Sequence, residues 1–182
     1  IMKKRMKNKL IEIRIHGRGG QGAMTSSQIL AMAAFYDGKY SQAFPIPGTE
    51  RGGAPVSAYV RISNEPINLR SEIYNPDYVI VLDPSLSKVI NVREGLKKDL
   101  IINTSKKIEK AKCVDATEIA FDIIKKPFVN IIMVSAFAAC TNLISLKSIL
   151  KAIEDKFEED KPEMVEKNKK AVKKIYEKIK NK

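Results

Sequence analysis

The sequence offers few of the side chains that hold metal ions. It contains two cysteines, Cys113 and Cys140, which are far apart and form no C-x-x-C pattern, and a single histidine, His16. Iron–sulfur clusters and zinc sites need several closely placed thiolates or imidazoles. The scarcity of these residues therefore argues against a metal site built by this chain alone. We expect both cysteines to be small core residues of a protein that resides in the reducing cytoplasm.

Candidate catalytic groups are also scarce. His16 stands beside a glycine-rich turn, where a lone histidine is more often a structural hydrogen-bonding residue than a base. Ser41, Ser57 and Ser135 lack the sequence context of a nucleophile elbow. We therefore assign no catalytic residue from the sequence.

No stretch of the sequence has the pattern of a signal peptide or of a membrane span. The basic residues 1–9 lead into no apolar segment, and we expect them to be a disordered or non-native N-terminal extension. The apolar stretch 130–144 is too short to cross a bilayer and is predicted to be a central buried helix. We expect residues 10–182 to fold as one domain.

Acidic residues are outnumbered by basic ones, 21 against 33, which gives a formal net charge of +12. Such an excess can indicate nucleic acid, an anionic cofactor or an acidic partner. The lysines are spread thinly, with a concentration at each end, and arginines do not interleave with aromatic residues as they do in single-strand binders. This pattern favours a solvated lysine surface, and we expect no nucleic-acid partner.

The stretch 10–22 organises the rest of the chain. Its first part, LIEIRIH, has the alternation of a strand, and its second part, GRGGQG, places Gly17, Gly19 and Gly22 at the spacing G-x-G-x-x-G. A helical pattern then begins at Ala23 and continues to Tyr36. Strand, glycine turn and helix together are typical of the start of a βαβ unit.

Predicted strands and helices alternate along the remaining chain. Strands are predicted at 40–44, 56–62, 67–70, 78–82, 100–102 and 111–114, and helices at 86–92, 115–124, 130–144, 145–157 and 162–179. The turn Asn64-Glu65-Pro66 predicts that 56–62 and 67–70 form an antiparallel pair at an edge. The alternation favours an α/β fold: a three-layer α/β/α sandwich with a mostly parallel sheet and a small antiparallel edge hairpin.

Two unusual loops are expected at one edge of this sheet. The glycine turn follows the first strand, and the second loop, residues 45–55, contains three prolines and three glycines. A loop this long in a compact domain is usually functional when it is ordered. Ligands of such sheets bind beyond the carboxyl ends of the strands, and the free N–H groups that open a helix attract anions. The two loops are therefore the candidate functional site.

The polar groups of these loops are hydrogen-bond donors rather than nucleophiles or bases. The candidate cofactor-binding residues are Gly17, Arg18, Gly19, Gly20, Gln21, Gly22, Glu50 and Arg51. The pair Glu50 and Arg51 either fixes its own loop or faces an anionic ligand or a neighbouring subunit. This inventory suits phosphate binding or contact with a partner protein better than independent chemistry.

A stand-alone nucleotide-binding module is an alternative function. The dinucleotide fingerprint needs an acidic residue at the end of the second strand, where this sequence has Ala43-Phe44-Pro45. The Gly-Lys-Ser/Thr sequence of a Walker loop is also absent. The glycine spacing alone is a weak indication of such a module.

Taken together, the motifs resemble those of the gamma subunits of pyruvate:ferredoxin oxidoreductases, also called pyruvate synthases, in the 2-oxoacid:ferredoxin oxidoreductase family. The matching segments are HGRGGQGA at 16–23, QAFP at 42–45, GTERGGAP at 48–55, LRS at 69–71, NPD at 75–77 and the helix 130–139. The sequence departs from this family at two positions. Gly52 stands where relatives commonly have a bulkier or basic residue, and Ser135 stands where they commonly have glycine.

The resemblance implies a non-catalytic subunit of a larger enzyme. That enzyme converts pyruvate and coenzyme A to acetyl-CoA and carbon dioxide with reduction of ferredoxin, or runs the reverse reaction. Thiamine diphosphate and iron–sulfur clusters of the 4Fe–4S type are expected on other subunits, and the gamma chain is associated with access of coenzyme A. The expected partners are the alpha, beta and delta subunits and, through the complex, ferredoxin, with no membrane contact.

The resemblance does not fix which 2-oxoacid is the substrate of the complex. Glycine loops of this type also occur in relatives that act on 2-oxoisovalerate or 2-oxoglutarate, although Arg18 is associated with the pyruvate group.

Overall fold

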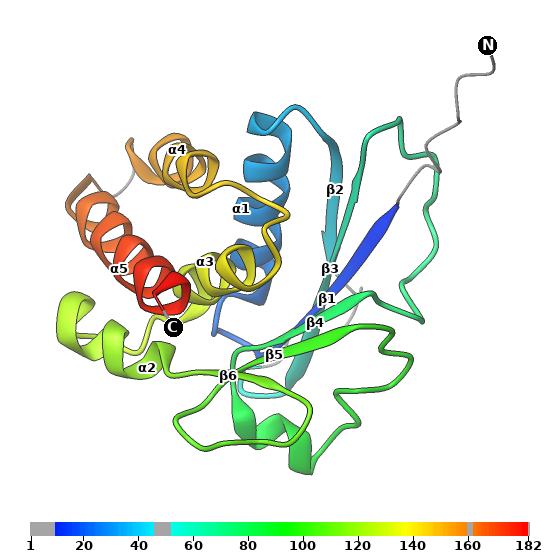
Figure 1. Ribbon diagram of the computed structural model, residues 1–182, viewed down its shortest axis with the longest axis horizontal. Coiled ribbons are helices and arrows are strands. Elements are labelled where there is room, and N and C mark those ends of the chain that lie inside the picture. Colours follow the sequence, from blue (N-terminus) through cyan, green and yellow to red (C-terminus); the bar gives the residue numbers. More distant parts are fainter. Residues whose placement is uncertain (1–9, 46–51, 160–161, 182) are drawn as a thin grey trace.

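A six-stranded sheet forms the centre of the molecule (Figure 1). The structure is a computed structural model that describes residues 10–45, 52–159 and 162–181. The strands are β1 (Ile11–Arg18), β2 (Tyr40–Pro45), β3 (Pro55–Ser63), β4 (Tyr78–Val81), β5 (Asp99–Asn103) and β6 (Lys112–Val114). Their order is β2-β3-β1-β4-β5-β6, and the pairs β1–β4, β4–β5 and β5–β6 are parallel.

The α-helices of the described residues lie on one face of this sheet (Figure 1). They are α1 (Ala23–Tyr36), α2 (Ala116–Ile119), α3 (Asn130–Thr141), α4 (Leu146–Phe157) and α5 (Pro162–Lys180), and α2 continues into the π-helical turn η2 (Ala120–Ile124). Nearly every side chain of α3 is buried, because the helix packs against both α1 and α5. The prediction of a central buried helix in 130–144 is therefore confirmed.

A thinner layer covers the other face of β4 and β5. It consists of the 3-10 helix η1 (Pro84–Lys88) and the turns that follow it. Ile80 belongs to the large core under the α-helices, whereas Val79 and Val81 pack with Leu86 and Leu100 on the opposite side. Both faces of β4 are thus buried, which is why its sequence is a continuous apolar run. The predicted α/β fold with a mostly parallel sheet is confirmed.

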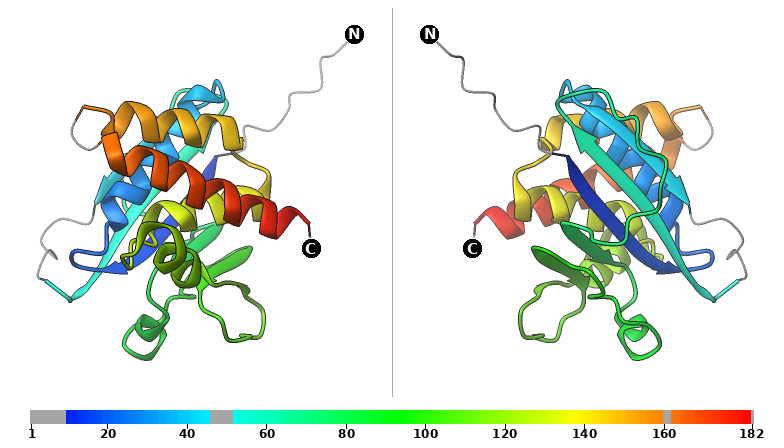
Figure 2. Two further views of the ribbon diagram at one scale, coloured as in Figure 1. Left: turned by 90° about the vertical axis from the view of Figure 1, so that its left-hand side faces the viewer. Right: turned by 90° about the vertical axis from the view of Figure 1, so that its right-hand side faces the viewer.

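The antiparallel edge of the sheet is formed by β2 and β3. The prediction that 67–70 pairs with 56–62 is wrong, because β3 already pairs antiparallel with β1 on one side and with β2 on the other. Neither side of β3 is left for a further strand. Figure 2 (right) shows residues 64–77 crossing in front of β3 instead, where Arg61 Nη2 donates to Ser71 O at 2.7 Å.

The two cysteines lie at the margins of the core rather than inside it. Cys113 and Cys140 are half-buried and free, and each packs against a different one of the two apolar clusters. Within the described part of the chain, no helix combines the length and the apolar character that a membrane span requires.

Candidate functional site

The chain leaves β1 and β4 toward opposite faces of the sheet. After β1 it enters α1 on the helical face, and after β4 it enters η1 on the other face. The two strands are parallel neighbours, with His16 beside Val81. Ligands of open α/β sheets bind beyond the carboxyl ends of strands at such a switch point. The candidate site therefore lies where β1 and β4 end.

The glycine turn connects β1 to α1 by a backbone path that requires glycine. Gly20 and Gly22 have φ angles of 90° and 79°, and Gly22 is the N-cap residue of α1. These positive φ angles strain any residue that has a Cβ. A Cβ built on Gly17 would lie 3.2 Å from Leu82 Cδ1, so this glycine also allows β1 and β4 to pack closely. The predicted strand, glycine turn and helix are confirmed.

The end of the second loop lies against the glycine turn. Gly19 N donates to Ala54 O at 2.8 Å, Gly53 N donates to Gly19 O at 3.1 Å, and Gly52 forms a bridge with Gly19. No atom lies within 4 Å of a Cβ built on Gly52, so this residue faces open space. The two predicted loops therefore meet at one edge of the sheet. The candidate residues Glu50 and Arg51 lie outside the described residues.

Arg18 connects three segments at this edge. Its Nε donates to Asp83 Oδ2 at 3.0 Å, its Nη1 to Gly53 O at 3.0 Å, and its Nη2 to Ser85 Oγ at 2.8 Å. The guanidinium thus joins the end of β1 to the second loop and to the start of η1. The side chain of Arg18 is 30% exposed and that of Asp83 is 19% exposed, so the ion pair is partly shielded from water.

Gln21 and Asp83 complete the same network. Gln21 Oε1 accepts from Arg18 N at 2.8 Å, and Gln21 Nε2 donates to Asp83 Oδ2 at 3.2 Å. The other oxygen of Asp83 accepts from Ser85 N at 2.9 Å and from Ser85 Oγ at 2.6 Å. Burial alone would raise the pKa of Asp83, but hydrogen bonds from its neighbours, those of Ser85 above all, hold this pKa below its usual value. Asp83 is therefore a carboxylate at neutral pH.

The backbone amides of the turn divide into two groups. The N–H groups of Arg18, Gly19 and Gln21 are used within the turn and its neighbouring loop. Among the hydrogen bonds of the described residues, none uses the N–H of Gly20 or Gly22. Because α1 begins immediately after Gly22, these two amides lie at the positive end of its dipole. These two N–H groups, together with those of the first turn of α1, are the backbone donors that the start of the helix offers.

Asn130 is a further polar residue at this edge, and the sequence motifs did not single it out as a site residue. It begins α3, and its amide carbon would lie 3.1 Å from a Cβ built on Gly22. Ser26 Oγ lies within hydrogen-bonding distance of both Gly22 O and Asn130 O, at 3.1 and 3.2 Å, and its one hydrogen links the starts of α1 and α3. No hydrogen bond between described residues uses the side-chain amide of Asn130.

His16 forms a hydrogen bond inside the sheet, as a structural histidine does. Its Nδ1 lies 2.8 Å from Ser57 Oγ on β3, and its side chain is almost completely buried. Burial lowers the pKa of His16 to about 4, with a smaller effect from the charge of Arg14. Serine hydrolases orient the histidine of such a pair with a carboxylate, but none of the described residues forms a hydrogen bond with the buried Nε2 of His16. The pair therefore lacks the arrangement of a catalytic dyad.

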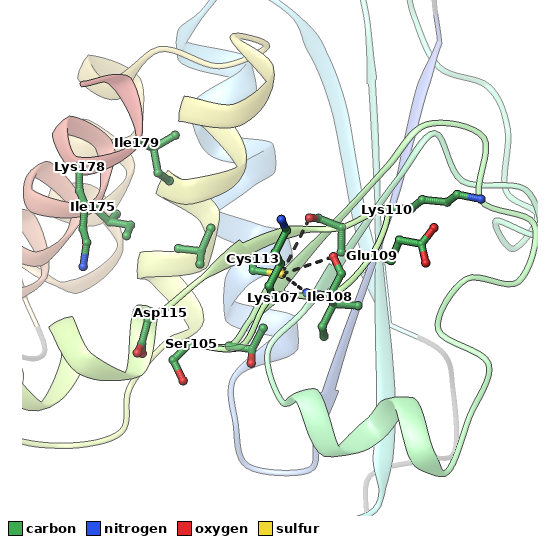
Figure 3. Close-up of a pocket in the computed structure, with 13 residues that line it drawn as sticks. Ser105, Lys107, Ile108, Glu109, Lys110, Cys113, Asp115, Ile175, Lys178 and Ile179 are labelled. Carbon is green, nitrogen blue, oxygen red and sulfur yellow. Dashed lines mark hydrogen bonds between the residues drawn. The ribbon is translucent and has the colours of Figure 1, made fainter. Parts of the chain in front are cut away.

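A cavity of about 550 Å³ lies beside β6, the edge strand on the opposite side of the sheet from β2 (Figure 3). The loop after β5, the end of β6 and α5 line it, and Cys113 Sγ accepts a hydrogen bond from Ile108 N at 3.2 Å in its wall. β6 is separated from β1 by β4 and β5, a spacing of roughly 14 Å across the sheet. The cavity contains none of the predicted site residues.

Comparison with known proteins gives matches over nearly the whole chain. The family described as Pyruvate ferredoxin/flavodoxin oxidoreductase matches residues 12–178. A protein of Methanocaldococcus jannaschii named pyruvate synthase subunit PorC is 54% identical over 173 residues, which cover 92% of this chain and 96% of that protein. A Pyrococcus furiosus protein named Pyruvate/ketoisovalerate oxidoreductases common subunit gamma is 47% identical over 182 residues, which cover 93% and 97% of the two chains.

A solved structure has the same fold. The crystal structure of pyruvate oxidoreductase subunit PORC from Thermotoga maritima matches with a TM-score of 0.77 and 39% sequence identity, covering 93% of this chain and 96% of that chain. The similarity in sequence and that in structure therefore extend over the same, nearly complete length.

Proposed function

Because the chain belongs to the pyruvate ferredoxin/flavodoxin oxidoreductase family, we propose that it is the gamma subunit of a pyruvate synthase complex. The complex converts pyruvate and coenzyme A to acetyl-CoA and carbon dioxide while ferredoxin is reduced, or runs in the reverse direction. The observation that carries this proposal is the 54% identity to a pyruvate synthase subunit over nearly the full length of both chains.

The chemistry of the described residues supports a role without bond-breaking steps. Within residues 10–45, 52–159 and 162–181, no three His, Cys, Asp or Glu side chains are grouped as metal ligands. His16 has a pKa of about 4 and is enclosed by the sheet, so it is not placed to exchange protons with a substrate. We assign thiamine diphosphate and the iron–sulfur clusters to the alpha, beta and delta subunits, and the contact with ferredoxin to the complex.

The contribution of this chain is to bind and orient coenzyme A at the edge of the sheet. Coenzyme A carries phosphate groups, and the N–H groups of Gly20 and Gly22 at the start of α1, which bond to no described residue, are suited to donate hydrogen bonds to them. The side-chain amide of Asn130 lies beside the same turn and adds a neutral donor. The charge of Arg18 is already compensated by Asp83, so the backbone and not this guanidinium is the main anion-binding group.

We propose that the choice of 2-oxoacid is made on other subunits. The Pyrococcus furiosus relative is named as a subunit common to pyruvate and ketoisovalerate oxidoreductases, so one gamma chain there serves two substrates. The candidate site of this chain, at the ends of β1 and β4, has donors for an anion. A complex that acts on 2-oxoisovalerate is therefore the second candidate function.

Purification of the native complex followed by subunit omission tests the proposed function. We expect the chain to co-purify with three other subunits, and expect complexes that lack it to lose acetyl-CoA formation from pyruvate and coenzyme A. Parallel assays with 2-oxoisovalerate and 2-oxoglutarate identify the substrate. Full acetyl-CoA formation without this chain would contradict the proposal.

The isolated chain distinguishes this role from that of a stand-alone nucleotide-binding module. Titration calorimetry with NAD should give no heat of binding, because the acidic residue of a dinucleotide fingerprint is missing after β2. Tight binding of NAD by the isolated chain would favour the module instead.

A further inference from the structure

Arg18 and Asp83 occupy the place where a ligand of an α/β sheet would be expected to make charged contacts. They stand at the carboxyl ends of β1 and β4, and their side chains meet at 3.0 Å. We propose that the two are positioning residues that lock the glycine turn in the shape needed for coenzyme A, and that Arg18 does not itself bind the phosphates. This inference rests on the proposed function of the chain.

The geometry of the guanidinium supports a positioning role. Arg18, at the end of β1, reaches Gly53 in the second loop and both Asp83 and Ser85 at the start of η1, so it joins three segments that come from different parts of the sequence. The planar guanidinium of an arginine donates hydrogen bonds to three acceptors in its plane at once, whereas the ammonium of a lysine cannot reproduce this geometry. Arg18 therefore fixes the turn relative to the second loop and to η1.

Asp83 holds the glycine turn through hydrogen bonds to two of its side chains. It accepts from Arg18 Nε and from Gln21 Nε2, which are the first and last polar side chains of the turn before Gly22. Gln21 in turn holds the N–H of Arg18 through its Oε1. These bonds hold Arg18 and Gln21, the residues on either side of Gly19 and Gly20, and so fix the backbone of the turn.

Removing the charge of Asp83 distinguishes a positioning role of Arg18 from direct phosphate binding by Arg18. If Arg18 bound a phosphate, Asp83 would compete for the guanidinium, and Asp83→Asn would strengthen coenzyme A binding. If Asp83 positions the turn, Asp83→Asn weakens the hydrogen bonds that this residue accepts from Arg18 Nε and Gln21 Nε2, and coenzyme A binding becomes weaker. The two roles thus predict opposite changes in the KM for coenzyme A.

The test uses the complete complex, reconstituted with variants of this chain and assayed with pyruvate, coenzyme A and a viologen acceptor. We expect Asp83→Asn and Arg18→Lys each to raise the KM for coenzyme A roughly tenfold, with a smaller change in the KM for pyruvate. The KM of the double variant for coenzyme A should exceed that of the more impaired single variant by no more than about twofold, because both substitutions disrupt the same network. Thermal unfolding and gel filtration establish that each variant folds and assembles.

Asp99→Asn is a matched control, because Asp99 also forms a 3.0 Å ion pair, with Lys112, but at the amino end of β5. It should leave the KM for coenzyme A unchanged. A lower KM in Asp83→Asn would overturn the positioning role, as would unchanged constants in both site variants. The proposed function is judged separately, since it fails only if the complex without this chain retains its coenzyme A-dependent activity.

Discussion

Gly22 and Asn130 are in such close contact that the glycine has no room for a side chain. A Cβ built on Gly22 would overlap the amide of Asn130, and its distance to Cγ would be 3.1 Å. Gly22 also has a φ angle of 79°, which residues with a Cβ rarely adopt. The start of α1 and the start of α3 are therefore fitted to each other through the smallest residue available.

Replacing Gly22 by alanine should destabilise the protein by about 2–4 kcal/mol, as the sum of left-handed strain and steric overlap. Urea unfolding of the purified chain measures this change. Gly38→Ala is the control, because Gly38 has a φ angle of 76° but no atom within 4 Å of a built Cβ. It should cost about 1 kcal/mol.

The additional variant Asn130→Ala should recover part of the stability lost in Gly22→Ala, since it removes the amide that the new methyl group meets. Equal losses in Gly22→Ala and Gly38→Ala would show that contact with Asn130 is unimportant for stability.

His16 should make the stability of the protein dependent on pH between about 7 and 5. The pKa of His16 is about 4 in the folded state against 6.5 for a histidine exposed to water, so in this window the unfolded chain binds a proton that the folded chain does not. Stability is therefore lost as the pH falls, by about 2 kcal/mol from this group between pH 7 and pH 5.

Chemical denaturation at pH 7, 6 and 5 measures the effect, with His16→Gln as the comparison. The glutamine retains a hydrogen-bonding group near Ser57 but has no proton to gain, so the variant should lose markedly less stability over this range. An identical pH dependence in the two proteins would show that His16 is not the group responsible.

Asp37 joins the end of α1 to the start of α4. Its carboxylate accepts from Ser145 N at 2.7 Å, from Ser145 Oγ at 2.7 Å and from Ser148 Oγ at 2.6 Å. We expect Asp37→Ala to cost about 2–3 kcal/mol, because three hydrogen bonds to a charged acceptor are lost and the N-cap serine of α4 loses its support. Thermal and urea unfolding report this loss.

Asp155→Ala is the comparison for Asp37→Ala, since Asp155 also pairs with side chains of neighbouring residues but at the surface. Its partners are Tyr36 and Lys151. A surface pair of this kind contributes little to the free energy of unfolding, so Asp155→Ala should have an unfolding midpoint near that of the wild type. Similar midpoints for both variants would contradict the role given to Asp37.

The sequence predicts those features of the fold that depend only on residues adjacent in the chain. The apolar run 78–82 indicates a strand buried on both faces, and Val79 and Ile80 do face two different clusters. The glycine spacing after β1 likewise predicts the turn, because the positive φ angles of Gly20 and Gly22 are a local requirement.

Pairings between distant segments could not be read in the same way. The strand predicted at 67–70 has a suitable composition, but β3 is occupied on both sides by β1 and β2, which no local pattern reveals. The sequence does not indicate Asp83 as a site residue, because its partner Arg18 is 65 positions away. Its position directly after a buried strand was the one available signal.

The roles given to Glu50 and Arg51 stay predictions, because both residues lie outside the described part of the chain.

Asn130 is a neutral residue that begins α3 beside the glycine turn. Asn130→Asp preserves the shape of the side chain and adds a negative charge at the start of a helix, where it is favourable for stability by about 0.3–1 kcal/mol. The same charge should repel the phosphates of coenzyme A. We therefore expect stability to be maintained or raised while the KM for coenzyme A increases by about tenfold in the reconstituted complex.

Asn142→Asp is the matched control for Asn130→Asp, because Asn142 follows the other end of α3, about 18 Å away along the helix. A negative charge there opposes the helix dipole but faces the Lys180 ammonium, whose Nζ already donates to Asn142 Oδ1, so this variant should gain no stability and keep the wild-type KM for coenzyme A. The two isosteric substitutions therefore differ in their predicted effect on coenzyme A binding. An unchanged KM in Asn130→Asp would place the phosphates of coenzyme A away from the start of α3.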